Sequence, residues 1–205
     1  SGGTSNYGVR NASSSPTMTL VTASASGGTF NYGVRNDSSS PAMQNVTASA
    51  SGGTYNYGVY NYDYSSPTMQ DVTASAAGGT NNYGVYNWSS SPTMNNVTAS
   101  AAGGTSNVGV RNDFSSPAIQ NSSLSASGGT SNYGVYNYAI SGSYTVRINN
   151  SQIITASTAT IRNDTWFTTR VGASLLAGGA MTGDGTVTCA GVYDEDYTFY
   201  ASTCP

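Results

Sequence analysis

Short runs in which apolar and polar residues alternate recur along the first two thirds of the chain, separated by Gly-Gly and Ser-Ser-Pro turn signals. Residues 21–26, for example, read Val-Thr-Ala-Ser-Ala-Ser. In an extended strand this alternation places the Val and Ala side chains on one face and the hydroxyls on the other. Apolar residues show no helical spacing, and a proline recurs in step in most copies. The pattern predicts an all-β chain whose Val-Ala-Ala faces point inward.

The strands belong to a longer repeat, which a Gly-Gly-Thr triplet marks most clearly. The triplets begin at Gly2, Gly27, Gly52, Gly78, Gly103 and Gly128. Neighbouring triplets are 25, 25, 26, 25 and 25 residues apart, a regularity typical of a solenoid. A leucine-rich repeat has a similar period, but this chain has only four leucines. Because three short strands fit into each copy, we expect a parallel β-helix (β-solenoid) of about 25-residue coils that hydrogen-bond to one another at about 4.8 Å.

Apolar residues recur at well-separated places in each copy, which predicts several inward-facing walls around a narrow core. One series is Val9, Val34, Val59, Val85, Val110 and Val135. A second is Met18, Met43, Met69, Met94 and Ile119, and a third is Val21, Val46, Val72 and Val97. A fourth, nearly invariant series is Tyr7, Tyr32, Tyr57, Tyr83 and Tyr133, with Val108 replacing Tyr in one copy.

Two asparagine series are invariant across the copies. They are Asn6, Asn31, Asn56, Asn82, Asn107 and Asn132, and Asn11, Asn36, Asn61, Asn87, Asn112 and Asn137. Asparagine tolerates turn conformations, and stacked amides can hydrogen-bond from one coil to the next. We therefore expect these residues to have a structural role rather than a binding role.

The repeat decays after Asn137, and larger apolar residues such as Trp166 and Phe167 enter near the C-terminus. Solenoids need their open ends covered. We therefore expect solenoid repeats over residues 1–163, with the last coil degenerate from residue 138, and a C-terminal cap over 164–205. Cys189 and Cys204 are expected to form a disulfide in an oxidising compartment, with a reduced pair as the cytosolic alternative. No cap precedes the first repeat, so either further coils precede it or it stacks on another molecule.

The stretch NYGVYN…SSPTM.NVTASASGGT resembles the repeats of bacterial right-handed parallel β-helix proteins of the pectate-lyase-like class. The ending TTRVGASLLAGGAMTGDGTVTCAGVYDEDYTFY resembles a terminal region of secreted members. The resemblance implies a right-handed parallel coil and export. It implies no single activity, because such folds host lyases, hydrolases, adhesins and tailspikes.

Composition narrows the possible functions. Only 7% of the residues are charged, the net charge is −3, and His is absent, as is Lys. Neither nucleic acid nor an acidic membrane surface is a natural partner of such a chain, and no segment is apolar enough for membrane insertion. The chain has one Glu and eight Asp that form no recurring carboxylate pair. We therefore expect no catalytic residues, no metal site and no cofactor, and we interpret Asp194-Glu195-Asp196 as a solvated acidic loop.

Positions that vary between copies are candidates for a displayed surface. Three such series contain a set of aromatic and arginine residues: Arg10, Phe30, Arg35, Tyr55, Tyr60, Tyr62, Tyr86, Trp88, Arg111, Tyr136 and Tyr138. Stacked rings and guanidinium groups attract one another, and an aromatic stripe often marks an interaction site. The alternative is that the stacking only stabilises the coil. A second surface consists of outward hydroxyls such as Thr22, Ser24 and Ser26.

We therefore predict an extracellular or cell-surface, non-enzymatic β-solenoid with a structural or adhesive role. Its expected partners are surface glycans or further copies of itself, assembled head-to-tail through the first coil. One alternative is a carbohydrate-active β-helix enzyme, either a polysaccharide lyase or a hydrolase. A second alternative is an ice-binding protein that uses the Thr/Ser face.

Overall fold

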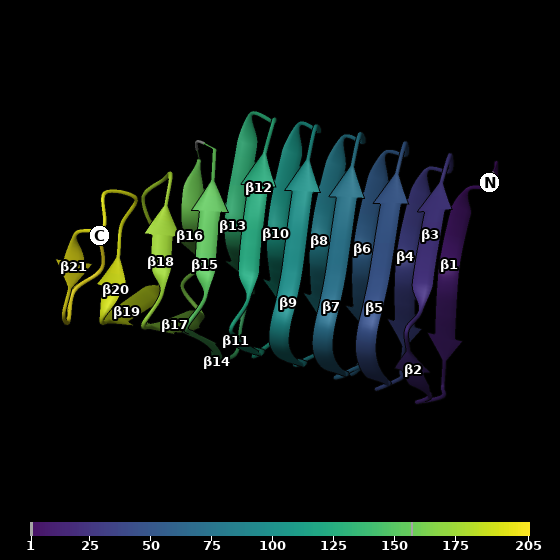
Figure 1. Ribbon diagram of the computed structural model, residues 1–205, viewed down its shortest axis with the longest axis horizontal. Coiled ribbons are helices and arrows are strands. Elements are labelled where there is room, and N and C mark those ends of the chain that lie inside the picture. The colour runs from purple at the N-terminus through teal and green to yellow at the C-terminus, as the bar shows by residue number, and fades with distance from the viewer. Residues whose placement is uncertain (1, 157) are drawn as a thin grey trace.

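The computed structural model describes residues 2–156 and 158–205 and shows the predicted all-β fold, a parallel β-solenoid (Figure 1). Strands of successive coils lie side by side along the long axis of the molecule, so that the chain advances from one end of a rod to the other (Figure 1). Within the described residues the strands form a seven-stranded sheet, here called sheet A, and a fourteen-stranded sheet, here called sheet B. The first seven coils contribute strands to both sheets, whereas the strands of the last coil, within residues 186–193, belong to sheet B alone.

Sheet A takes one strand from each of the first seven coils, in chain order. Its strands are β1 (Ser5–Ala12), β4 (Phe30–Asp37), β6 (Tyr55–Tyr62), β8 (Asn81–Trp88), β10 (Ser106–Asp113), β13 (Ser131–Tyr138) and β16 (Ala159–Asn163). They pair in parallel and in register, so that Tyr32 lies beside Tyr57 and Val34 beside Val59. Equivalent residues of successive copies therefore form columns along the rod.

Sheet B is bent. In three coils it is crossed by one long strand each: β5 (Ala42–Ser51), β7 (Thr68–Ala77) and β9 (Thr93–Ala102). In the other coils the same path is divided into β2 (Thr17–Thr19) and β3 (Thr22–Ser26), β11 (Ala118–Gln120) and β12 (Ser123–Ser127), β14 (Tyr144–Asn149) and β15 (Gln152–Thr155), β17 (Phe167–Gly172) and β18 (Leu175–Ala177), and β19 (Thr186–Ala190) and β20 (Val192–Tyr193). The final strand is β21 (Phe199–Tyr200).

A left-handed residue produces the bend. Asn45, Asp71 and Asn96 lie in the middle of the three long strands with φ between 52° and 55°. Asn and Asp adopt this conformation more readily than other residues with a Cβ. The coil therefore has the three sides that the sequence predicted, but two of them belong to one continuous sheet.

The core lies between the two sheets and consists of the predicted columns. Val34 of sheet A, Met43 and Val46 of sheet B and their equivalents are almost fully buried in one continuous cluster. Ala23 and Ala25 point inward while Thr22, Ser24 and Ser26 are exposed, as predicted. Where the Ala column faces sheet A, the coil is too thin for a side chain on the opposite strand. A Cβ on Gly33 would lie 2.6 Å from the backbone N of Ser49 and 2.9 Å from the carbonyl carbon of Ala48.

Both predicted asparagine ladders are present and buried inside the coil. In the first, the Asn31 amide donates to Oδ1 of Asn56 at 3.0 Å and to the carbonyl of Ser51 at 3.1 Å. In the second, Asn36 donates to Asn61 at 2.8 Å. The second ladder continues to Asn163 in β16. The structural role expected for these residues is confirmed, because their amides bond within the coil and to the next coil.

The C-terminal region continues one of the two sheets. Parallel pairing in sheet B extends beyond residue 163: β17 pairs with β14 and β19 pairs with β17, while β18 and β20 extend the other half of sheet B. Only β21 departs from the pattern among the described strands, because it pairs antiparallel with β20. Sheet A, in contrast, ends with β16 at Asn163, the position of the predicted boundary. Phe167, one of the bulky residues on which the cap prediction rests, packs inside the coil as Val and Met do in earlier copies.

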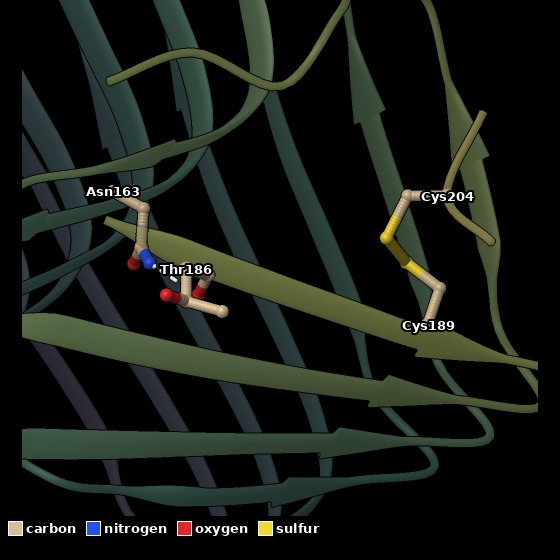
Figure 2. The surroundings of a disulfide bond; sticks show 4 residues. All are labelled: Asn163, Thr186, Cys189 and Cys204. Carbon is tan, nitrogen blue, oxygen red and sulfur yellow. Dashed lines mark hydrogen bonds between the residues drawn. A yellow bond between two sulfur atoms is a disulfide. The ribbon is translucent and has the colours of Figure 1, made fainter. Parts of the chain in front are cut away.

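The predicted disulfide is present and fastens the end of the chain to the last coil. Cys189 of β19 lies in the same inward column as the Met residues of earlier coils. Cys204 forms the disulfide with it, and the Cα atoms of the two cysteines are 5.1 Å apart (Figure 2). In the same region Asn163 ends the second ladder. No further Asn follows it in the ladder, and its amide donates to the carbonyls of Thr186 at 2.8 Å and Phe167 at 3.0 Å (Figure 2). The disulfide and this hydrogen-bonded residue close the C-terminal end of the rod.

Candidate binding face of aromatic rings and arginines

An irregularity in the sheet A strands decides which side chains face outward. Gly33 faces sheet B across the core, and the next residue, Val34, is fully buried in the same core. Two successive inward positions interrupt the alternation expected for a strand. As a result Tyr32, before them, and Arg35, after them, both lie on the outer face. The equivalents of residues 5, 7, 10 and 12 therefore form four outward columns on every coil.

The invariant Tyr series is one of these outward columns, a placement that sequence reasoning missed. Tyr7, Tyr32 and Tyr57 stack with ring centroids 5.1 and 4.9 Å apart and planes within 7° of parallel. This separation matches the spacing of neighbouring strands. The Tyr rings form a cluster of their own, separate from the core between the sheets. The rings bury one another, so their faces are occupied by stacking and are not available as a platform.

Arginines lie between the rings of the next column. The guanidinium carbon of Arg35 is 5.0 Å from the ring centre of Tyr32 and 5.5 Å from that of Tyr60. Arg111 is held in the same way, 5.2 Å from Tyr86 and 5.0 Å from Tyr136. A cation over a ring face is attracted by the ring quadrupole, most strongly where water is excluded. These arginines therefore stabilise the stack of rings.

Each of these arginines also has a carboxylate two residues further along its strand. Nε of Arg35 bonds Oδ1 of Asp37 at 2.6 Å, and Nε of Arg111 bonds Oδ1 of Asp113 at 2.9 Å. The Arg-Asn-Asp motif recurs at 162–164, where Arg162 and Asp164 are 3.8 Å apart. The first copy has Arg-Asn-Ala at 10–12, and the remaining copies have Tyr-Asn-Tyr or Tyr-Asn-Trp. After the first copy, the variable columns therefore hold either an Arg–Asp pair or an aromatic pair in each copy.

The most buried of these groups form a small polar network. The Asp113 side chain is 1% exposed and accepts both guanidinium bonds of Arg111 as well as a bond from the Tyr86 hydroxyl. Burial raises the pKa of Tyr86 far above its usual range, and the charge and hydrogen bond of Asp113 add to the rise. Tyr86 therefore stays protonated and donates. We interpret this network as structural, because none of its side chains is accessible to a large ligand.

All eleven predicted surface residues lie on the outer face of sheet A, but few are well exposed. Tyr86 is buried, and Arg35, Tyr60 and Arg111 are half-buried. Phe30 and Tyr55 stack on each other at 5.0 Å, and Tyr136 packs against Tyr133. Of the eleven, only Arg10, Tyr62 and Trp88 are exposed. Apart from Tyr7 in the first coil, the exposed rings on this face therefore lie at the edge where the strands end.

That edge carries a group of rings, here called the aromatic corner: Tyr62, Tyr64, Trp88, Phe114, Tyr138 and Tyr144. Neighbouring rings there are 6.1 to 6.4 Å apart and inclined by 48° to 78°, unlike the parallel Tyr stack. The rings therefore do not cover one another. Tyr64 is 81% exposed, and it occupies the extra residue that lengthens the third copy.

A hollow lies beside these rings, at the turn that follows sheet A. Its volume is about 460 Å³, and its walls are Tyr64, Phe114, Tyr144, Ser66, Ser89 and Ser91. Sequence reasoning missed the three aromatic members, because they do not belong to the repeating columns. The available signal was the one-residue insertion that supplies Tyr64.

The predicted hydroxyl face lies on the outside of sheet B, away from the rings. Thr22, Thr47, Thr73, Thr98 and Ser123 are in register along it. The next coil places Gln152 and Ile154 in the outward columns, which ends the array. A separate open groove of about 720 Å³ follows the Gly-Gly-Thr turns and is lined only by Gly and Thr residues.

The carboxylates do not assemble into a metal-binding group anywhere in the described part of the chain. Asp63 bonds the hydroxyl of Ser38, and Asp71 bonds side-chain amides of Gln70 and Asn96. Asp194 accepts hydrogen bonds from the backbone N–H groups of Asp196 and Thr198 and from Tyr200, which lower its pKa.

The described residues include no helix long and apolar enough to cross a membrane. The chain was compared with protein-family models and with curated proteins and matches none of them.

Proposed function

We propose that this β-solenoid is an extracellular adhesive protein that binds neutral glycans at the aromatic corner. The observation that carries the proposal is the hollow between Tyr64, Phe114 and Tyr144, which has ring walls, serine hydroxyls and no charged side chain in its lining. Ring faces are electron-rich and attract the C–H edges of a sugar, while hydroxyls both donate and accept hydrogen bonds. The disulfide supports an oxidising compartment.

The rest of the outer face of sheet A fits the role of a rigid support. Its rings stack on one another and its arginines form ion pairs, so these side chains support the aromatic corner and do not present ring faces to a ligand. We therefore propose binding at the edge of the predicted stripe, through Tyr62 and Trp88 together with the hollow. The carbohydrate-active enzyme is not our preferred proposal, because the carboxylates of Asp37, Asp113 and Asp164 are each paired with arginine.

A structural role through head-to-tail assembly would need an open strand edge at both ends of the rod. At the C-terminal end β21 pairs antiparallel with β20, and Cys204 covers the last core position at Cys189. Parallel addition of another copy there would require this segment to move. We therefore propose adhesion rather than polymerisation as the main function. Abundant filaments in electron micrographs of the concentrated protein would contradict this choice.

A glycan array followed by titration of the best neutral oligosaccharide tests the proposal. The variants Tyr64→Ala and Phe114→Ala should weaken binding by about tenfold or more, because each removes one ring wall of the hollow. Tyr197→Ala is the matched control, since Tyr197 is an exposed ring outside the corner. An array without hits, or equal binding by all three variants, would refute the proposal. Thermal hysteresis with faceted ice crystals would instead support a function for the hydroxyl face.

A further inference from the structure

Two arginines interrupt a column of small residues on the outside of sheet B. Arg147 of β14 and Arg170 of β17 are direct neighbours in the parallel register. The same column holds Thr or Ala in the five preceding coils and Thr188 in the following one. Both side chains are exposed. The hollow beside them shares no lining residue with the hollow of the aromatic corner, although Tyr144 of the corner also lies on β14.

Arg147 and Arg170 are the two arginines that have no carboxylate partner among the described residues. Arg10, Arg35, Arg111 and Arg162 each pair with an Asp on sheet A, whereas no described residue forms an ion pair or a side-chain hydrogen bond with Arg147 or Arg170. Like charges directly opposite each other on neighbouring strands destabilise a sheet. A bound anion would offset this repulsion, and no carboxylate among the described residues does so.

The two guanidinium groups border a hollow of about 410 Å³ that contains further hydrogen-bonding groups and no carboxylate. Asn149 and Thr188 are among its walls. Gly172 leaves room for the Asn149 side chain, because a Cβ at Gly172 would lie 2.7 Å from the Asn149 Oδ1 atom. The hollow thus combines two positive charges with an amide and a hydroxyl that donate hydrogen bonds.

We propose that Arg147 and Arg170 form an anion-binding site for a sulfate or phosphate ester group. Each guanidinium presents a planar fork of N–H donors, and the strands that carry the two are about 4.8 Å apart. A single guanidinium group can already engage both oxygens of a carboxylate. A tetrahedral oxyanion has further oxygens, so it can accept hydrogen bonds from two guanidinium groups at once. The negative charge of a bound oxyanion also offsets the repulsion between the arginines. The ester group of a sulfated polysaccharide and free inorganic sulfate share this chemistry.

Thermal unfolding with millimolar sodium sulfate or sodium phosphate, against sodium chloride of equal ionic strength, is the first test. Wild type should be stabilised by the oxyanions, while Arg147→Gln and Arg170→Gln should not. Without added anion, each variant should be more stable than wild type, because it relieves the like-charge pair. Arg10→Gln is the matched control, since it removes one positive charge from an exposed arginine that has a carboxylate partner. Equal stabilisation of wild type and both variants would overturn the site.

Binding to dextran sulfate and to unmodified dextran distinguishes the two sources. If the ligand is a sulfated polymer, wild type should be retained on dextran sulfate and not on unmodified dextran. Arg147→Gln and Arg170→Gln should each bind dextran sulfate about tenfold more weakly, and Arg10→Gln should bind it like wild type. Response to inorganic sulfate without retention on the polymer would assign the site to a free anion. Absence of both responses would overturn the proposal. Tyr64→Ala should bind dextran sulfate like wild type, so failure of the glycan site and failure of this site are distinguishable.

Discussion

At the residue scale, Asp113 shows how a charge is kept on the outer face of a nearly uncharged rod. Its carboxylate is buried beneath aromatic rings, where an ionised group is stable only with a close partner. Arg111 supplies two bonds, at 2.9 and 3.1 Å, and Tyr86 supplies a third. The sequence places Arg and Asp two residues apart, which indicates that they share a strand face. It does not indicate that rings would cover them.

The variant Asp113→Asn should lower the free energy of unfolding by about 3 kcal/mol, because it leaves the half-buried Arg111 without its counter-charge. Unfolding in guanidinium chloride at neutral pH measures the effect. Asp63→Asn is the control, since Asp63 is exposed and bonds only the Ser38 hydroxyl. Equal destabilisation by the two substitutions would show that the buried ion pair is not the cause.

Gly58 shows the opposite constraint, a place where no side chain fits. A Cβ there would lie 2.5 Å from the Gly84 carbonyl oxygen and 2.6 Å from the backbone N of Ser75. Because both atoms are backbone, the sheets themselves would have to separate. Gly58→Ala should therefore lower the melting temperature strongly, with a loss of about 3 kcal/mol or more. Gly3→Ala is the comparison, since its nearest contact is 3.5 Å away, and a similar melting temperature for both variants would contradict the argument.

At the element scale, in-register parallel strands turn each repeat position into a column. Hydrogen bonds between equivalent amides then recur from coil to coil, as does stacking between equivalent rings where neighbouring copies both carry Tyr. Columns of Val, Met, Ala and Asn were predictable for this reason, since a residue's neighbours are its own equivalents. The Tyr column was not placed, because its direction depends on Gly33 and Val34 both facing inward.

The Tyr column predicts a loss of stability at alkaline pH. Burial first, and neighbouring Tyr residues second, raise the pKa of Tyr57 and Tyr60 above the usual value of about 10. Above that pH the unfolded chain releases protons that the folded chain retains, so the free energy of unfolding should fall as the pH rises beyond about 10. Denaturant unfolding between pH 8 and 12 measures the slope. Tyr57→Phe should flatten it and the exposed-ring variant Tyr197→Phe should not; identical slopes would exclude the buried Tyr as the source.

At the scale of the whole molecule, the rod is a stack in which each coil contacts mainly its neighbours. Stability in such an array is local, and the ends are its weakest parts. Cys204 fastens the last segment to Cys189 across 15 residues, on the coil that carries β19 and β20. The antiparallel β21 adds the only reversed pairing in the described sheets. Both features lie within residues 164–205, the region of the predicted cap.

Removal of the disulfide by Cys189→Ser with Cys204→Ser should weaken the last coil by about 3 kcal/mol on chain-entropy grounds. Hydrogen exchange should become faster over residues 175–205 and stay unchanged in the central strands β6 to β9, because coupling along the rod is short-ranged. Serine at both positions keeps the side chains similar in size. Uniformly faster exchange along the rod would show that the end controls the whole molecule.

Strict repetition makes each position the neighbour of its copies, so the parallel coil, its register, its core columns and its asparagine ladders were predictable from the amino-acid sequence. The tertiary structure sets the direction of the Tyr column and brings Tyr64, Phe114 and Tyr144 together. It also decided the pairing of Arg147 with Arg170, since sheet B is in register there across coils of 29 and then 23 residues. These contacts join residues that are not equivalent in the repeat. They depend on how turns of unequal length fold, and a period of 25 carries no information about that.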